Sequence, residues 1–132
     1  MSFGPKEPKP TAREERETYA AVTVRDPWCV RCGAAGIQRD HRKNRSQGGL
    51  TVPSNLQGLC GSCHRFKTLN PAAAVLEGFA VPGWGRPEFW PAWRVDVGSW
   101  VVYFDVPDSR GRWWDEVTES TADLLMQGRT LP

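Results

Sequence analysis

The four cysteines of this 132-residue chain occur as two C-x-x-C pairs, which is the spacing of metal ligands. Cys29 and Cys32 form the first pair, and Cys60 and Cys63 form the second. Four thiolates suit the tetrahedral coordination of Zn²⁺, and a closed site of this kind leaves no position for water. We therefore expect one structural zinc ion. Zinc is favoured over disulfides because the N-terminus lacks the apolar segment of a secretory signal.

The segment between the two pairs, and the residue after the second, carry side chains that suit phosphodiester hydrolysis. A neutral histidine can take a proton from water, and both histidines of the chain, His41 and His64, lie here. A divalent ion held by oxygen and nitrogen ligands can stabilise the phosphate and the leaving oxygen. Asp40 and His41 would point to opposite faces of a strand, so they can do different tasks. One step along a helix turns a side chain by about 100°, so Cys63 can bind zinc while His64 faces a second ion.

These features resemble the HNH endonucleases of the ββα-metal group, in the phage-type subgroup that has two CxxC zinc knuckles. The resemblance runs from Cys29 to about Lys67. It rests on four stretches in the order and spacing of the family, Asp40-His41, Arg45-Ser46-Gln47-Gly48-Gly49, Asn55-Leu56 and Cys60-Gly61-Ser62-Cys63-His64-Arg65-Phe66-Lys67. In one departure, Arg42-Lys43-Asn44 follows His41 where many members have an apolar residue and a proline. The path of this loop and its DNA contacts are therefore the least defined part of the resemblance.

The resemblance implies a metal-dependent endonuclease that nicks or cleaves DNA with little sequence preference. It implies that Asp40 and His64 bind the catalytic divalent ion, that His41 is the general base, and that Asn55 fixes the hairpin loop and orients the base. The catalytic ion is expected to be Mg²⁺ or Mn²⁺, with Ni²⁺ and Zn²⁺ as alternatives. The subgroup is typical of bacteriophages, which implies a role in DNA packaging together with the terminase.

Each of these residues also has a simpler interpretation. His64 could be the fourth ligand of a Cys3His zinc site, and His41 could be an inert surface histidine. Asp40 could pair only with a neighbouring arginine, and Asn55 could serve only as a turn or cap residue. Two other functions also stay open, a zinc DNA-binding module without catalysis and a protein-docking adaptor. The joint presence of Asp40, His41 and His64 favours the nuclease, because a protein that only binds has no need of all three.

The charge of the chain is divided between its segments. The net charge of the whole sequence is +2, but residues 25–67 carry eight Lys/Arg against two Asp/Glu, whereas residues 68–132 carry five against nine. A basic excess on the motif segment is expected if that segment faces a polyanion. The candidate phosphate contacts, of which Arg45 and Lys67 are the strongest, are Arg42, Lys43, Arg45, Arg65 and Lys67.

The sequence predicts an α+β fold with a small zinc-stabilised ββα-metal core of treble-clef-like form. Residues 1–10 are expected to be a disordered tail, and residues 11–70 the nuclease core with an N-terminal helix over 11–25. Thr11 and Glu14 form a capping-box pattern at the start of that helix. Strands are predicted over 37–42 and 55–59, with a turn over 46–49 whose paired glycines allow positive φ. The second knuckle should then open a helix that Asn70-Pro71 interrupts.

Residues 71–132 are expected to pack on the core as an extension with a helix over 71–79 and a tryptophan-rich β-hairpin. Strands over 99–106 and 112–117 flank a turn signal at 108–111, and residues 81–93 are predicted to be irregular. The last dozen residues are expected to form a frayed helix or to be disordered. Six tryptophans lie here, and a small aromatic core is favoured over a base-stacking surface because acidic residues surround them. A protein-docking patch is the more plausible functional use.

The sequence lacks any apolar run long enough to span a bilayer. We therefore expect no membrane partner and a cytoplasmic location, in the host bacterium if the protein is phage-encoded. DNA is the expected partner, and the chain is expected to be a monomer or a weak dimer.

Overall fold

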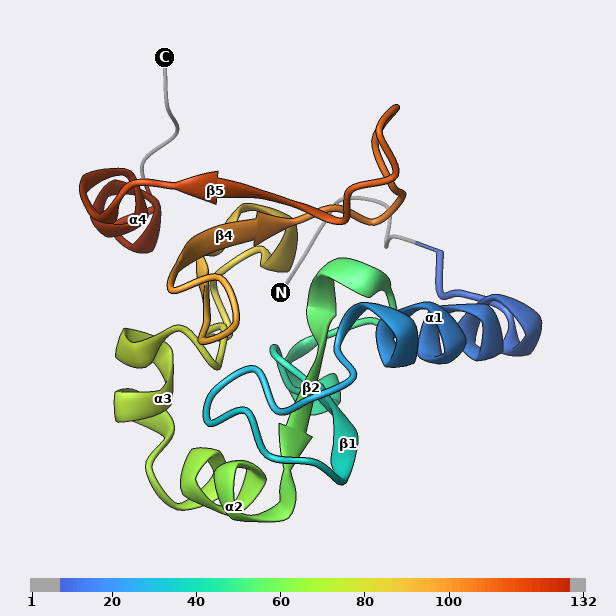
Figure 1. Cartoon of the computed structure of the whole chain (residues 1–132), viewed down its shortest axis with the longest axis horizontal. Helices are drawn as coiled ribbons and strands as arrows, with labels where there is room; N and C mark the ends of the chain where they lie inside the picture. Colours follow the sequence, from blue (N-terminus) through green and yellow to red (C-terminus); the bar gives the residue numbers. More distant parts are fainter. Residues whose placement is uncertain (1–7, 129–132) are drawn as a thin grey trace.

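The computed structural model describes residues 8–128, so most of the predicted N-terminal tail and the last four residues lie outside the described part. The helices are α1 (Ala12–Arg25), α2 (Gly61–Leu69), α3 (Pro71–Glu77) and α4 (Glu119–Met126). The strands are β1 (Ile37–His41), β2 (Leu56–Cys60), β3 (Ala92–Arg94), β4 (Ser99–Tyr103) and β5 (Trp114–Val117). In Figure 1, β1, β2, α2 and α3 lie in the lower half, with β4, β5 and α4 above them. No helix within residues 8–128 has the length and apolar character needed to cross a membrane.

The core is an antiparallel β1–β2 hairpin followed by α2, which confirms the predicted ββα arrangement. The register pairs Asp40 with Gln57. Strand β2 starts one residue later than predicted, because residues 53–55 form a 3₁₀ turn. All five residues of β2 are buried, so this strand is covered on both faces, whereas two residues of β1 are exposed. Helix α2 ends at Leu69, since the proline at 71 lacks the N–H that would continue it.

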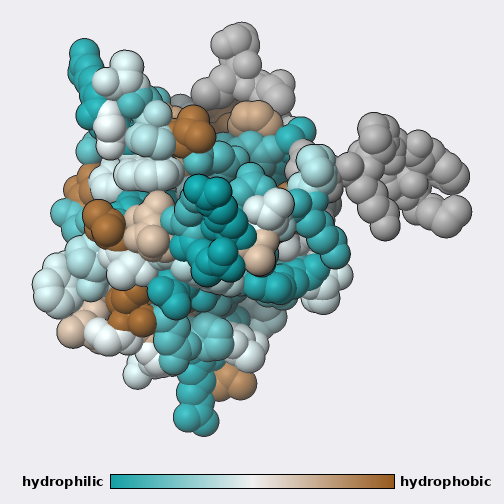
Figure 2. All heavy atoms as spheres, turned by 90° about the vertical axis from the view of Figure 1, so that its right-hand side faces the viewer, coloured by the Kyte–Doolittle hydropathy of each residue, from teal (hydrophilic) through white to brown (hydrophobic). Residues whose placement is uncertain are grey.

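Helix α1 begins at the predicted capping box. The Thr11 hydroxyl accepts a hydrogen bond from the Glu14 amide at 3.1 Å, and the Thr11 amide donates to the Glu14 carboxylate at 3.0 Å. The helix ends at Arg25, just before Asp26-Pro27. Its Val22 is 1% exposed and anchors the helix in the protein interior. The opposite side is polar, and Figure 2, which faces the side where α1 lies, shows a mostly hydrophilic surface with scattered hydrophobic residues.

The C-terminal half contains one strand more than the sequence predicts. Strands β3, β4 and β5 form an antiparallel sheet in that order, so the expected hairpin is extended by residues 92–94. Strand β3 has only three residues, in a segment rich in Pro and Trp, which is too short to show an alternation of apolar and polar residues in the sequence. Its strand conformation comes from pairing with β4. Most tryptophans are at least partly buried, as predicted, and Trp93 meets Trp100 edge-to-face at 5.6 Å. Trp84 is the exception in this half, being 66% exposed.

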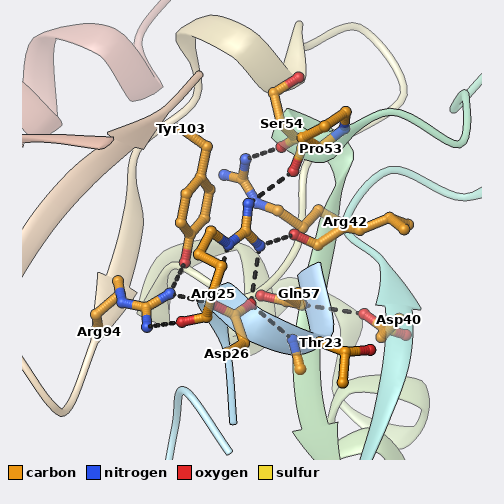
Figure 3. Close-up of polar contacts among 12 residues, drawn as sticks. Thr23, Arg25, Asp26, Asp40, Arg42, Pro53, Ser54, Gln57, Arg94 and Tyr103 are labelled. Atoms are coloured by element: carbon orange, nitrogen blue, oxygen red, sulfur yellow. Dashed lines mark hydrogen bonds and ion pairs between the residues drawn. The ribbon is translucent and has the colours of Figure 1, made fainter. Parts of the chain in front are cut away.

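The two halves meet at a buried ionic group that we call the Asp26 cluster, formed by Arg25, Asp26, Arg94 and Tyr103 (Figure 3). Asp26 is fully buried and accepts two hydrogen bonds from Arg25, one from Arg94 and one from the Gly58 amide. Burial would raise the pKa of Asp26, but the two guanidinium groups outweigh it and hold the pKa below its usual value. The cluster joins β3 to the end of α1 and to β2.

Candidate active site and zinc centre

The four cysteines predicted to bind zinc converge at one point. Their sulfur atoms all lie within 4.8 Å of one another, and those of Cys32 and Cys60 are 3.6 Å apart. A disulfide requires about 2.05 Å. Four sulfurs at about 2.3 Å from a tetrahedral Zn²⁺ are separated by about 3.8 Å, so the donor set and its size fit zinc. The loop before β1 brings Cys29 and Cys32 to the junction of β2 and α2, where Cys60 ends the strand and Cys63 lies in the first turn of the helix.

The thiols of Cys29 and Cys63 differ in how readily they ionise. Burial opposes ionisation of Cys29, but backbone N–H groups of Cys60, Cys32 and Arg31 lower the pKa of Cys29 to about 7. Burial and the neighbouring thiols raise the pKa of Cys63 to about 12, although Arg31 donates to its sulfur at 3.5 Å. Four thiolates this close would repel one another, and a Zn²⁺ at their centre supplies the charge that removes the repulsion.

Asp40 and His64 lie next to one another in the lining of a cleft of about 450 Å³. The Asp40 Oδ1 and His64 Nε2 atoms are 3.5 Å apart. Two ligands at about 2.1 Å from one ion are separated by about 3.0 Å at a right angle and about 3.4 Å at the tetrahedral angle, so this pair fits one divalent cation. The thiol cluster contains all four cysteines and not His64, so the structure favours a four-cysteine site over the Cys3His alternative.

The second oxygen of Asp40 is held by two residues of the core. Lys67 Nζ and Gln57 Nε2 each lie 3.0 Å from Asp40 Oδ2. Lys67 also donates to the His41 carbonyl at 2.7 Å and is only 9% exposed. The ammonium group of Lys67 is therefore engaged inside the site, and Lys67 lines the cleft itself, so its contact with a phosphate stays a prediction. Gln57 was not predicted, and only the hairpin register, which pairs it with Asp40, identifies it.

His41 ends β1, and its Nε2 atom is 2.9 Å from the hydroxyl of Thr51. Its ring is not among the residues that line the Asp40–His64 cleft in the described part of the chain. Burial, followed by the charge of Arg45, lowers the pKa of His41 against the opposing effect of Asp40. His41 is therefore neutral at physiological pH, which is the form that can accept a proton. Thr51 carries no motif signal and was not predicted.

Asn55 holds the loop that follows β1. Its side-chain oxygen accepts from the Lys43 amide at 2.7 Å, and its nitrogen donates to the Lys43 and Leu50 carbonyls at 3.1 and 2.9 Å. The loop has a further sequence requirement. Gly48 has a positive φ of 90°, as predicted, but Gly49 does not. At Gly49 a Cβ atom would lie 1.9 Å from the Lys43 oxygen, so glycine is needed there for the close approach of two backbone segments.

The remaining basic residues predicted to contact DNA differ in exposure. Arg42 is 1% exposed and donates to the carbonyls of Ser54, Pro87 and Trp90 at 2.6, 3.1 and 2.9 Å, so its prediction as a DNA contact is wrong. Figure 3 shows Arg42 beside Ser54, and its further bonds to Pro87 and Trp90 tie the C-terminal extension to this segment. Lys43 is half-buried and donates to the Gly85 carbonyl at 3.1 Å, whereas Arg45 and Arg65 are exposed.

Comparison with known proteins gives one match. Residues 29–69 match the family model described as HNH endonuclease. No curated protein and no solved structure matches the chain. The matched segment contains the four cysteines, β1, β2 and α2, and hence every residue of the zinc centre and of the Asp40–His64 cleft described above as an ion ligand.

Proposed function

Because residues 29–69 match the HNH endonuclease family model, we propose that this protein cleaves DNA phosphodiester bonds with the help of a divalent ion. The observation that carries the proposal is the pairing of Asp40 Oδ1 with His64 Nε2 at 3.5 Å in a cleft, with the histidine assigned as base next to Asp40 in β1. A structural zinc centre alone would give a binding module, but it would not require this second pair of ligands.

In the proposed reaction, Asp40 and His64 hold the divalent ion, which supplies Lewis-acid stabilisation of the phosphate and the leaving oxygen. Lys67 and Gln57 fix Asp40 Oδ2, so that Oδ1 remains directed towards His64. His41, neutral at physiological pH, takes a proton from the attacking water. Asn55 keeps the loop after β1 in place through its three hydrogen bonds. The chain thereby separates base and ion ligand onto successive residues of one strand.

The proposed DNA contacts are the exposed side chains near this site. Arg45 lies on the loop after β1 and Arg65 on α2, and both are exposed. Lys43 is a lesser contributor, since its ammonium group is partly used by the Gly85 carbonyl. Contacts of this kind are made to phosphates and carry no base information, which fits cleavage with little sequence preference.

The test is conversion of supercoiled plasmid to nicked and linear forms by zinc-loaded protein, with EDTA and then with added Mg²⁺, Mn²⁺, Ni²⁺ or Zn²⁺. His41→Ala should lose about 10² to 10⁴ in rate while keeping DNA affinity and zinc content. Asp40→Asn and His64→Ala should lose cleavage and weaken binding of Mn²⁺ measured by calorimetry. Glu17→Gln, which alters an exposed ion pair on α1, is the matched control.

The second candidate is a zinc module that binds DNA without cutting it. It would be supported if the wild-type protein bound duplex DNA but cleaved none with any of the four ions. The proposal also includes a biological role, in which the enzyme works with a phage packaging terminase. This role follows from the resemblance of the two zinc knuckles to the phage-type subgroup. Co-elution of the purified protein with purified terminase, and stimulation of cleavage by it, would test that part.

A further inference from the structure

One polar contact of the site has no place in the mechanism above. Thr51 lies in the loop between β1 and β2, is 3% exposed, and directs its hydroxyl at His41 Nε2 from 2.9 Å. The same hydroxyl oxygen accepts a hydrogen bond from Arg45 Nη2 at 3.3 Å. Arg45 Nη2 in turn donates to the Tyr19 hydroxyl at 3.1 Å, and Tyr19 lies on α1. A chain of polar contacts therefore runs from α1 to the assigned base.

We propose that Thr51 is a positioning residue for the reaction. It accepts the Nε2–H proton of neutral His41 and so leaves Nδ1 as the nitrogen that takes the proton from water. This inference rests on the proposed function of His41 as the base.

The argument starts from the two nitrogens of the imidazole ring. In a neutral ring one nitrogen carries a proton and the other has a free lone pair. Nε2 faces a buried hydroxyl, so it is Nδ1 that is left for a water molecule. Nδ1 can act as a base only if the proton resides on Nε2, and that proton then needs an acceptor. Thr51 supplies it, since a hydroxyl oxygen has two lone pairs and Arg45 uses one of them.

The surroundings of Thr51 restrict the position of its hydroxyl oxygen more than they would on the protein surface. Threonine is β-branched and has few side-chain rotamers, and this residue is buried. Arg45 has no acceptor and can only donate to the hydroxyl, so it uses one lone pair of the Thr51 oxygen and leaves the second for the Nε2–H proton. The opposite pattern, in which Thr51 donates to Nε2, would place the ring proton on Nδ1 and leave no base there.

Two substitutions separate the hydroxyl from the shape of the side chain. Thr51→Val keeps the branched shape and removes the hydroxyl, whereas Thr51→Ser keeps the hydroxyl. We expect Thr51→Val to lower kcat by about 10- to 100-fold with KM for DNA changed less than about twofold, because a misdirected base affects chemistry and not phosphate binding. Thr51→Ser should retain kcat within about threefold of wild type. Zinc content and thermal melting of both variants show whether each is folded.

The second measurement does not depend on cleavage. Histidine ¹⁵N chemical shifts of zinc-loaded wild-type protein without a catalytic ion report which nitrogen of His41 is protonated, with His41→Ala used to assign the signal. The Nε2–H form is expected in wild type and in Thr51→Ser, and a mixture of both forms in Thr51→Val. An Nδ1–H form in wild type, or equal kcat for Thr51→Val and wild type, would overturn the inference. If the wild-type protein cleaves no DNA, the proposed function fails, and the ¹⁵N result still decides the pairing of Thr51 with His41.

Discussion

Replacing Asp26 with asparagine should separate the C-terminal extension from the core more effectively than any surface substitution. Asp26 is fully buried and accepts hydrogen bonds from Arg25, Arg94 and the Gly58 amide. Asparagine keeps the shape but removes the negative charge, which leaves the buried guanidinium of Arg25 without its carboxylate partner and that of Arg94 with Asp96 alone. Breaking a buried ionic group in this way costs about 3 to 5 kcal/mol of unfolding free energy.

The expected change in melting temperature follows from the size of the chain. An unfolding entropy of about 2.1 cal/mol/K per residue over 132 residues converts the loss into a fall of about 11 to 18 °C in Tm. The assay is thermal unfolding followed by circular dichroism at neutral pH with zinc in excess, so that the metal contributes equally to all samples. Zinc content should be unchanged in the folded variant, since Asp26 contacts no thiol.

Glu17→Gln provides the control, because it breaks the exposed Arg13–Glu17 pair, whose side chains are 83% and 66% exposed. It should change Tm by no more than about 2 °C. A fall for Asp26→Asn as small as that of the control would show that the Asp26 cluster does not hold the extension on the core. Such a result would refute the reasoning from burial and hydrogen bonding, whatever the effect on DNA cleavage.

Three other results are expected. Cys60→Ser should lose zinc by elemental analysis and unfold the core, because metal binding in such a module is part of its folding free energy; a folded, zinc-free variant would contradict this. The acidic limb of the pH–rate profile should have its midpoint below about 6.5, because burial and Arg45 lower the pKa of His41. The base works only when it is neutral, so activity should be kept above that lowered pKa and lost below it. Arg45→Ala should lower the slope of log affinity against log salt by about one unit, as measured by duplex titrations. Arg42→Met should leave that slope unchanged and destabilise the fold, as measured by thermal melting, because Arg42 is buried. Equal slopes for the wild type and Arg45→Ala would show that the DNA contacts lie elsewhere.

Much of the core could be predicted because its signals are local. The spacing of the two C-x-x-C pairs predicts the cysteine cluster that could hold zinc, and the capping box at Thr11 and Glu14 fixes the start of α1 within one turn. The order Asp40-His41 in a strand, with His64 one step beyond Cys63 in a helix, predicts which side chains turn towards one another. These relations follow from backbone geometry, so they hold without knowledge of the distant chain.

The tertiary structure alone decided which charged and polar side chains are available. Arg42 looks like a phosphate contact in the sequence, but it is buried because carbonyl groups 12 to 48 residues further along the chain surround its guanidinium group. Lys67 is likewise drawn into the site by Asp40 from another element. Gln57 and Thr51 carry no pattern of their own, and they matter only because strand pairing and loop closure bring them to Asp40 and His41. A long polar side chain can satisfy its hydrogen bonds in water or inside the protein, and only the positions of its distant partners determine which of the two occurs.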